Sequence, residues 1–251
     1  MKVAALYDIH GNLPALEAVL EEIDVIQPDR ILLGGDGVFG PFPRATLERL
    51  LSMGDKAVFI RGNCDREAVA AFDDLPLDPS LPEEIRAVTI WSAKQLERNQ
   101  RDFLAGLQER VVLDIDGVGE VLFCHGSPRS DEEIITRATP VARLEEILAD
   151  VRPSVVVCGH THMQFDRVIN GTRLVNAGSV GMPYGGTGAY WLLLGPEIML
   201  RRTPYDLERA AARIRASSYP AAQDFVDNNV LHPPSEAEAI ELFERLATER
   251  S

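Results

Sequence analysis

Cysteine is scarce in this sequence and is not spaced for a structural role. The three cysteines, Cys64, Cys124 and Cys158, are an odd number and lie far apart along the chain. A secreted disulfide scaffold uses an even set of cysteines, and a structural zinc site uses Cys-x-x-Cys pairs, which do not occur here. The sequence therefore excludes both kinds of small scaffold, and its cysteine usage fits a reducing cytoplasm.

Positive charge and long apolar runs are also in short supply. The chain has 25 lysine and arginine residues against 39 aspartate and glutamate residues, a formal net charge of −14. A protein that binds a nucleic-acid duplex needs a basic surface to displace counterions from the phosphates, so we expect no such partner. The sequence has no apolar run of about 18 residues and no charged-then-apolar leader, so we expect no membrane partner and a cytoplasmic location.

What the sequence does contain is the composition of an ordinary globular domain. Hydrophobic residues make up 45% and charged residues 25% of the 251 residues, which are values typical of globular proteins. No internal repeat, low-complexity tract or linker divides the chain. We predict a single domain over residues 1–251, with a core of about 1–203 and a C-terminal helical extension of about 204–251.

Short apolar runs alternate with helical patterns in the first part of the chain. The runs at 3–7, 30–34 and 57–60 are each followed by a polar loop that contains glycine, and an amphipathic helical pattern begins at Leu13. This order predicts βαβ units and an α/β fold. In such sheets the functional groups collect on the loops at the carboxyl ends of the strands.

The later part of the chain has more closely spaced strand patterns. A helical segment is expected over about 81–107. Strands are then expected at 111–116, 121–124, 154–158, 165–169, 172–176, 189–194 and 198–202. Their spacing suggests hairpins and a more antiparallel sheet. From Asp206 onward we expect outer helices, with a break at Pro233-Pro234 and a capped restart at Ser235.

Metal-binding side chains follow several of the predicted strands. The candidate ligands are Asp8, His10, Asp36, Asn63, His125, His160 and His162. Imidazole, carboxylate and amide oxygen together suit a divalent ion such as Mn, Fe, Zn or Ni. One histidine at a strand end is usually structural, but five such loops indicate a metal site. Seven ligands exceed what one tetrahedral ion uses, which favours two ions that share a bridging carboxylate.

The motifs around these ligands resemble those of a known superfamily. They are Asp-x-His-Gly-Asn at 8–12, Gly-Asp-Gly at 35–37 with Gly-Pro at 40–41, Gly-Asn-x-Asp at 62–65, His-Gly-Ser-Pro at 125–128 and Gly-His-Thr-His at 159–162. In this order they resemble the calcineurin-like metallophosphoesterases, and the stretch 176–183 resembles the glycine-rich turn of small prokaryotic members. The resemblance implies a four-layer α/β/β/α sandwich of two mixed sheets, with a dinuclear metal site at the loops after the strands.

The resemblance also implies roles for these residues. Asp8, His10 and His162 would hold the first ion, Asp36 would bridge, and Asn63, His125 and His160 would hold the second ion. Manganese is the ion expected first, with Fe, Zn and Ni left open. The implied activity is hydrolysis of a small phosphoester, most of all a phosphodiester, by in-line attack of a metal-bridging hydroxide. The residues expected to serve catalysis are His10, Asp36, Asn63, Cys64, Asp65 and His125.

The third position of Gly-Asn-Cys-Asp departs from the commoner motif of the superfamily. Members with Gly-Asn-His-Asp use the histidine as the candidate proton donor for the leaving group, oriented by the following aspartate. Cys64 stands in that place here and Asp65 follows it, as in a branch of small prokaryotic phosphodiesterases. A thiol is a weak hydrogen-bond donor. We therefore expect a preference for esters with good leaving groups, unless Cys64 is a small apolar filler at a helix start.

Other residues are candidates for contact with the substrate. Asn12 either contacts the phosphoester or shapes the turn after Gly11. Arg129 either binds a second phosphate or a carboxylate, or is a solvated loop residue, and Asn63 is a substrate contact as well as a ligand. Tyr184 indicates either a flexible rim near the site or a hairpin turn. Association of identical subunits is left open.

Two alternative functions are considered. One is a hydrolase of nucleotides or dinucleoside polyphosphates, which an aromatic lining of the cleft would support. The other is a non-catalytic binding module, as in the retromer subunit that resembles these phosphoesterases but has lost ligands. The complete set of seven ligand positions favours the enzyme.

Overall fold

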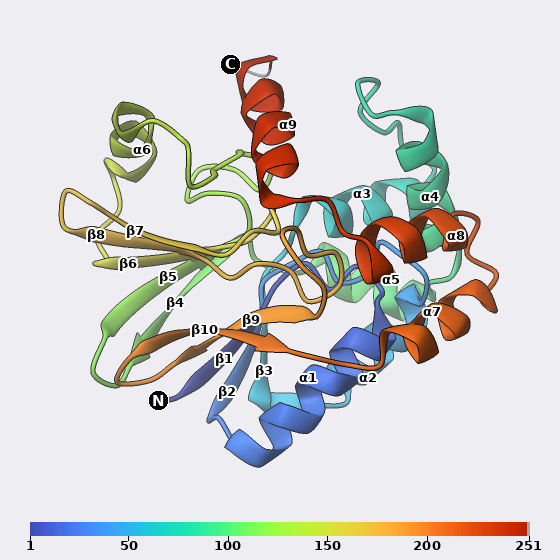
Figure 1. The fold of residues 1–251 in the computed structure, drawn as a ribbon, viewed down its shortest axis with the longest axis horizontal. Coiled ribbons are helices and arrows are strands. Elements are labelled where there is room, and N and C mark those ends of the chain that lie inside the picture. Colours follow the sequence, from blue (N-terminus) through green and yellow to red (C-terminus); the bar gives the residue numbers. More distant parts are fainter. Residues whose placement is uncertain (250–251) are drawn as a thin grey trace.

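The computed structural model, which describes residues 1–249, contains two five-stranded mixed sheets (Figure 1). The first sheet has the strand order β10-β9-β1-β2-β3, with β1 (Val3–Leu6), β2 (Arg30–Leu33), β3 (Ala57–Phe59), β9 (Ala189–Leu194) and β10 (Ile198–Thr203). The second has the order β4-β5-β6-β8-β7, with β4 (Arg110–Ile115), β5 (Gly119–Cys124), β6 (Val155–Cys158), β7 (Phe165–Ile169) and β8 (Thr172–Asn176). The predicted α/β fold with two mixed sheets is confirmed.

Helices surround the two sheets. In the first part of the chain they are α1 (Leu13–Ile26), α2 (Pro43–Leu51), the 3-10 turn η1 (Gly54–Lys56), α3 (Asn63–Phe72), α4 (Glu83–Lys94) and α5 (Arg98–Ala105). They are followed by α6 (Val141–Leu148), α7 (Leu207–Arg215), α8 (Ala222–Phe225), the π-helical η2 (Val226–Leu231) and α9 (Glu236–Glu249). The segment predicted helical over about 81–107 thus forms two helices, and the backbone N–H of Glu97 donates to Gln100 where α5 begins.

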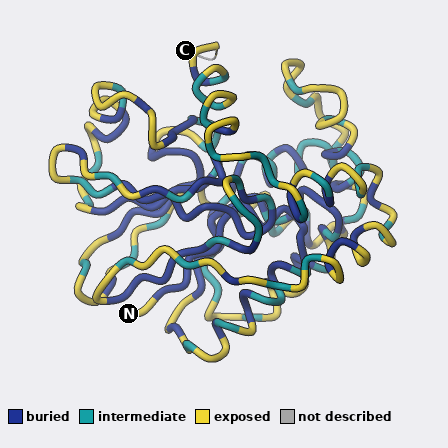
Figure 2. The backbone as a smooth tube through the Cα atoms, viewed as in Figure 1, coloured by how far each residue is buried: buried dark blue, intermediate teal, exposed yellow. Residues whose placement is uncertain are grey.

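Alternation of side chains along the strands produces the layers. In β1, Val3 and Ala5 pack between the sheets, whereas Ala4 and Leu6 pack on the helical side of the first sheet. Successive strand residues point to opposite faces, so a strand covered on both faces reads as a continuous apolar run. Strands β1 and β6 are accordingly buried at every residue, and the middle of the molecule is largely dark blue in Figure 2.

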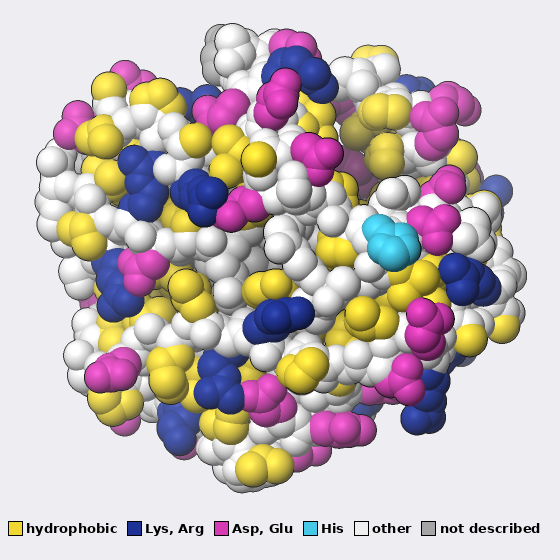
Figure 3. Space-filling model, viewed as in Figure 1, with side chains coloured by type: hydrophobic (Ala, Val, Ile, Leu, Met, Phe, Trp, Pro, Cys, Tyr) yellow, Lys and Arg dark blue, Asp and Glu magenta, His cyan; other side chains and the backbone are white. Residues whose placement is uncertain are grey.

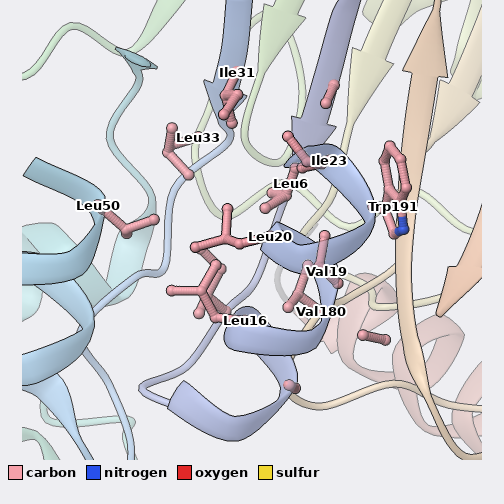
Figure 4. Packing of buried hydrophobic residues seen from close by; sticks show 14 of the residues in the cluster. Leu6, Leu16, Val19, Leu20, Ile23, Ile31, Leu33, Leu50, Val180 and Trp191 are labelled. Carbon is pink, nitrogen blue, oxygen red and sulfur yellow. The ribbon is translucent and has the colours of Figure 1, made fainter. Parts of the chain in front are cut away.

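Helix α1 covers the outer face of the first sheet. Its residues Leu16, Val19, Leu20 and Ile23 are buried, as the helical pattern that begins at Leu13 predicts, and they pack in one cluster with Leu6, Leu33, Leu50 and Trp191 (Figure 4). On the far side of the molecule, α6 packs against the outer face of the second sheet. Helix, sheet, sheet and helix therefore follow one another, which is the four-layer order that was predicted.

The expectation of a more antiparallel second half was only partly right. In the second sheet β4–β5 and β7–β8 pair antiparallel, but β5–β6 and β6–β8 pair parallel. Helix α6 carries the chain from β5 back to the start of β6, so β5 and β6 are parallel, and β7 returns the chain so that β8 is parallel to β6. The hairpin β9–β10 joins the first sheet, where β9 lies antiparallel beside β1.

The C-terminal segment is helical and lies against the core, as predicted. The side chain of Asp206 caps α7 by accepting from the backbone N–H of Arg209. Ser235 and Glu238 bond each other reciprocally where α9 begins. None of the helices within residues 1–249 has the combination of length and apolar character that a membrane span needs. On the face drawn in Figure 3, Lys and Arg side chains are interspersed with Asp and Glu.

Two substitutions on opposite faces of α1 test the packing of this layer. Leu16 is fully buried and Val25 is 84% exposed. We expect Leu16→Ala to lower the free energy of unfolding by about 2–5 kcal/mol, because it removes apolar contacts and leaves a cavity. Val25→Ala should change it by less than about 0.5 kcal/mol. Denaturant unfolding measures both, and equal effects would contradict the layering.

Candidate metal centre

The sequence-predicted ligands come together where the strands of both sheets end. Asp8 and His10 follow β1, Asp36 follows β2, Asn63 follows β3, His125 follows β5, and His160 and His162 follow β6. The ligand atoms of Asp8, His10 and His162 all lie within 4.8 Å of one another, and so do those of Asp36, His125 and His160. Two groups of three, joined through common neighbours, are the geometry of a two-ion site.

The loops that carry the ligands have an unusual backbone. Left-handed φ angles occur at Asp8 (52°), His10 (48°), Asp36 (56°), His160 (65°) and His162 (57°). Such conformations cost free energy for residues other than glycine and concentrate at functional sites. Bonds between loops hold them in place, including His10 N–H to Asp36 O at 2.8 Å and Gly159 N–H to His125 O at 2.8 Å.

Imidazole nitrogens and carboxylate oxygens face one another across the centre. The Nε2 atoms of His10 and His162 are 3.0 Å apart. The Oδ1 atom of Asp8 lies 3.3 Å from His162 Nε2, and Asp36 Oδ2 lies 3.3 Å from His125 Nε2. Asp36 Oδ2 is also 3.8 Å from His10 Nε2. Asp36 therefore stands between the two groups, in the place of a bridging ligand.

Two of the histidines are held in one orientation by backbone carbonyls. The Nδ1 of His125 lies 2.8 Å from Gly34 O, and the Nδ1 of His162 lies 2.8 Å from Met182 O. A carbonyl accepts hydrogen bonds only, so in both rings Nδ1 carries a proton. Such bonds are typical of metal-binding histidines, because they turn the other nitrogen toward the metal. In both rings that nitrogen, Nε2, faces the cluster.

Four buried polar atoms of the cluster have no hydrogen-bond partner within residues 1–249. They are Asp8 Oδ1, His10 Nδ1, Asn63 Oδ1 and His125 Nε2. Buried polar atoms are nearly always paired, since an unpaired one costs free energy. Three of these four belong to one carboxylate, one amide and one oriented imidazole, all of which bind divalent cations. The donor set therefore fits metal ions.

Charges in the centre are strongly coupled. Burial opposes ionisation of Asp36, but His125 and His10 hold the pKa of its carboxyl well below its usual range. Burial likewise opposes the charged form of His125, yet Asp36 and Asp8 raise its pKa to about 10. Burial, and next the neighbouring His162, lower the pKa of His10 to about 4. Burial and His125 do the same for His160, to about 4.

Asp65 supports the loops rather than facing the imidazoles. Its carboxylate accepts hydrogen bonds from the backbone N–H groups of Asp36 (2.8 Å), Gly62 (3.0 Å) and Gly37 (3.0 Å). It is 2% exposed, and burial and Asp36 raise its pKa to about 6. Asp65 thus positions Asp36 through the backbone, a role that its place in the motif did not suggest.

Cys64 borders the centre. Its Sγ lies within 4.8 Å of ligand atoms of His10 and Asp36, and its backbone N–H donates to Asp36 Oδ1 at 2.8 Å. Burial, followed by the nearby Asp36, raises the pKa of the Cys64 thiol well above its usual value. The thiol is therefore protonated at neutral pH. It also packs with a cluster that contains Phe39 and Tyr219.

The other predicted substrate contacts have partners of their own. Asn12 is fully buried, donates to Gly181 O at 2.9 Å and accepts from Ala15 N at the start of α1, so it shapes the turn. Arg129 is paired with Glu133, and no ion pair within residues 1–249 links it to the ligand cluster.

Contacts from the C-terminal extension reach the metal centre. The ring of Tyr184 stacks on His162 with centroids 5.6 Å apart, and Phe243 of α9 packs edge-on against Tyr184 at 5.9 Å. The backbone N–H of Gly185 donates to Pro234 O. The loop at Tyr184 is thus held by α9. The sequence left open whether Tyr184 lies at a rim near the site or in a hairpin turn, and it gave no signal for Phe243, which lies in a separate element.

Comparison with known proteins shows, independently of the site geometry, which family this chain is similar to. Residues 1–195 match the model of the calcineurin-like phosphoesterase superfamily domain. The phosphodiesterase YfcE of Escherichia coli is 26% identical over 208 residues, which cover 79% of this chain and 90% of YfcE.

Two solved structures have the same fold. A metallophosphoesterase from Sphaerobacter thermophilus is 27% identical with a TM-score of 0.69, and the protein PH1004 from Pyrococcus horikoshii is 24% identical with a TM-score of 0.76. Each alignment covers 90% of this chain and 96% of the other. The similarity to PH1004 therefore includes much of the chain beyond residue 195.

Loading with metal is expected to displace a proton from His125. With a pKa of about 10 its ring is protonated near neutral pH, and a cation that takes Nε2 must replace that proton. The apparent affinity for Mn²⁺ should rise about tenfold per pH unit between roughly pH 7 and 9. Calorimetry in buffers of different ionisation enthalpy measures the released proton. An affinity that is independent of pH would contradict this charge arrangement.

Proposed function

This chain belongs to the calcineurin-like phosphoesterase superfamily, and we propose that it is a dinuclear metal-dependent phosphodiesterase. The observation that carries the proposal is the cluster of six carboxylate and imidazole ligands, with buried Asp8 Oδ1 and His125 Nε2 unpaired within residues 1–249 and the amide oxygen of Asn63 unpaired in the loop after β3. The similarity to YfcE, a phosphodiesterase by name, supports the choice of a diester.

The residues divide between two ions. Asp8, His10 and His162 would hold one ion. Asn63, His125 and His160 would hold the other ion, and Asp36 would bind both. When bound, such ions polarise the phosphoester and lower the pKa of water. They also reverse the charge of the site, because two divalent ions outweigh the carboxylates of Asp8 and Asp36. An anionic phosphoester can thereby bind to an acidic protein. Manganese is the ion we propose.

Burial indicates the side from which the phosphoester approaches. Asp8, His10, Asp36, His125 and His162 are all buried, whereas Asn63 and His160 are half-buried. These two residues, from the loops after β3 and β6, form the accessible edge of the cluster. Cys64, next to Asn63, is also half-buried and would face the leaving group there.

The remaining parts of the function stay predictions. The substrate is a small phosphoester, and no nucleic-acid duplex or membrane is expected as a partner. Association of identical subunits is compatible with the fold. A cytoplasmic location rests on the sequence arguments alone.

Removing the shared ligand tests the proposal directly. Asp36→Asn should lose the second ion and lower the rate of phosphodiester hydrolysis by more than about 100-fold, since even the hydrogen-bond partners of metal ligands contribute about 10–100-fold. Asp166→Asn is the matched control, because Asp166 is paired with Arg173 on the surface. Metal content and hydrolysis of bis(p-nitrophenyl) phosphate are measured together. Unchanged activity and metal content in Asp36→Asn would overturn the proposal.

The protonated thiol of Cys64 makes a separate prediction about the leaving group. Because a thiol donates weakly, kcat should fall steeply as the pKa of the leaving alcohol rises across a series of aryl and alkyl phosphodiesters. A general acid contributes about 10²–10⁴-fold. Cys64→His should therefore raise the rate on alkyl esters toward that range and flatten the dependence. If kcat of the wild-type enzyme did not change with the pKa of the leaving alcohol, weak proton donation by Cys64 could not be what limits the rate.

A further inference from the structure

His162 is held from two sides by one short segment of the chain. The carbonyl oxygen of Met182 lies 2.8 Å from Nδ1 of His162. The ring of Tyr184, two residues further on, is centred 5.6 Å from the imidazole, and the two ring planes are inclined by only 19°. This segment therefore contacts both an edge and a face of the imidazole, and its position decides the direction in which Nε2 of His162 points.

Helix α9, red in Figure 1, packs on this segment from outside. The ring of Phe243 lies edge-on against Tyr184, with centroids 5.9 Å apart and planes inclined by 71°. Edge-to-face pairs at this separation attract each other beyond their buried area. The backbone N–H of Gly185 also donates to Pro234 O at 2.9 Å, shortly before the helix begins. The rings of His162, Tyr184 and Phe243 thus form a continuous series from the ligand cluster to α9.

The same helix is bonded to a second loop beside the ligands. The Oε1 atom of Glu244 accepts hydrogen bonds from the hydroxyl groups of Thr136 at 2.5 Å and Thr139 at 3.0 Å. The hydroxyl of Thr161, which stands between the two histidines of the ligand loop, donates to Ile135 O at 2.9 Å. Helix α9 therefore connects two segments that both lie against the loop after β6.

The ligand loop after β6 depends on such support. His160 and His162 have left-handed φ angles of 65° and 57°, and such a backbone persists only where the surrounding structure holds it. The Nε2 atom of His162 lies 3.0 Å from His10 Nε2 and 3.3 Å from Asp8 Oδ1. A small displacement of His162 would therefore be felt first at the ion that these three residues are expected to hold.

We propose that Phe243 and Tyr184 are positioning residues for His162, through which the packing of α9 on the core sets the affinity of the first metal ion. The first ion is the one assigned to Asp8, His10 and His162. The inference rests on the proposed function, since it takes His162 as a ligand. Coupling between two equilibria is reciprocal, so binding of the first ion should in turn stabilise the packed position of α9.

Calorimetric titration of the metal-free protein with Mn²⁺ tests the inference without an activity assay. An Asn63→Ala background weakens the second ion, so that the titration reports the first. In it, Phe243→Ala should lower the affinity about 2–30-fold, the range for coupled residues that touch no ligand. Phe243→Tyr keeps the ring and should bind as Phe243 does. Leu242→Ala is the matched control, because Leu242 is 38% exposed on the same helix, and it should leave the affinity unchanged.

A double-mutant cycle and hydrogen exchange separate positioning from a general loss of stability. If Phe243 acts through Tyr184, Phe243→Ala should cause no further loss of affinity in a Tyr184→Ala background. Saturating Mn²⁺ should slow amide exchange in α9 of the wild type, and do so less in Phe243→Ala. Thermal unfolding without metal verifies that each variant is folded.

Three results would overturn the inference. They are an unchanged first-ion affinity in Phe243→Ala, an equal loss when Tyr184 is already replaced, and exchange in α9 that Mn²⁺ does not alter. A wild-type chain that binds fewer than two ions would instead overturn the proposed function.

Discussion

Two carboxylates, Asp8 and Asp36, are buried side by side among four imidazoles at the edge where both sheets end, and the rest of the site depends on this arrangement. Buried charges of this kind are stable only when opposite charges compensate them. In the protein alone, His125 provides the compensation through its raised pKa. Metal ions would provide it more completely, and they would also satisfy the unpaired atoms of Asp8, Asn63 and His125.

The loops around these carboxylates follow from the same constraint. Five ligand residues have left-handed backbones, which tight turns directly after a strand require. Close packing of the turns leaves no space for side chains at certain glycines: a Cβ on Gly62 would lie 2.1 Å from Asp36 Oδ1. Asp65, at the start of α3, then accepts hydrogen bonds from the backbone N–H groups of Asp36 and Gly62. The strain is held by hydrogen bonds between loops that come from both sheets.

Much of this could be predicted from the sequence, because the ligands follow apolar runs and strand ends converge at one edge of a sheet. The buried face of α1 was predicted from its helical pattern, whereas the sandwich of two mixed sheets was what the resemblance to the superfamily implied. The role of Asp65 and the contact of Phe243 with Tyr184 were not predicted. They depend on side chains that meet through the backbone of another loop or between separate elements, and no periodic pattern in the sequence marks them.

Cys64 and the C-terminal extension both make contacts around the metal centre. Cys64 packs with Phe39 and Tyr219 on one side and reaches His10 and Asp36 on the other. The extension contributes Tyr219 to this cluster and Phe243 to the contact with Tyr184, so it supports the metal centre from outside the matched region of residues 1–195. The side of the cluster next to Cys64 is accordingly less polar than a histidine in place of Cys64 would make it.

The most direct test of the two-ion centre is anomalous diffraction from crystals grown with Mn²⁺. The account predicts two peaks about 3.5–4 Å apart, as in other two-metal hydrolase sites. One peak should lie beside Asp8, His10 and His162, the other beside Asn63, His125 and His160, with Asp36 between them. A single peak, or peaks away from these residues, would contradict it.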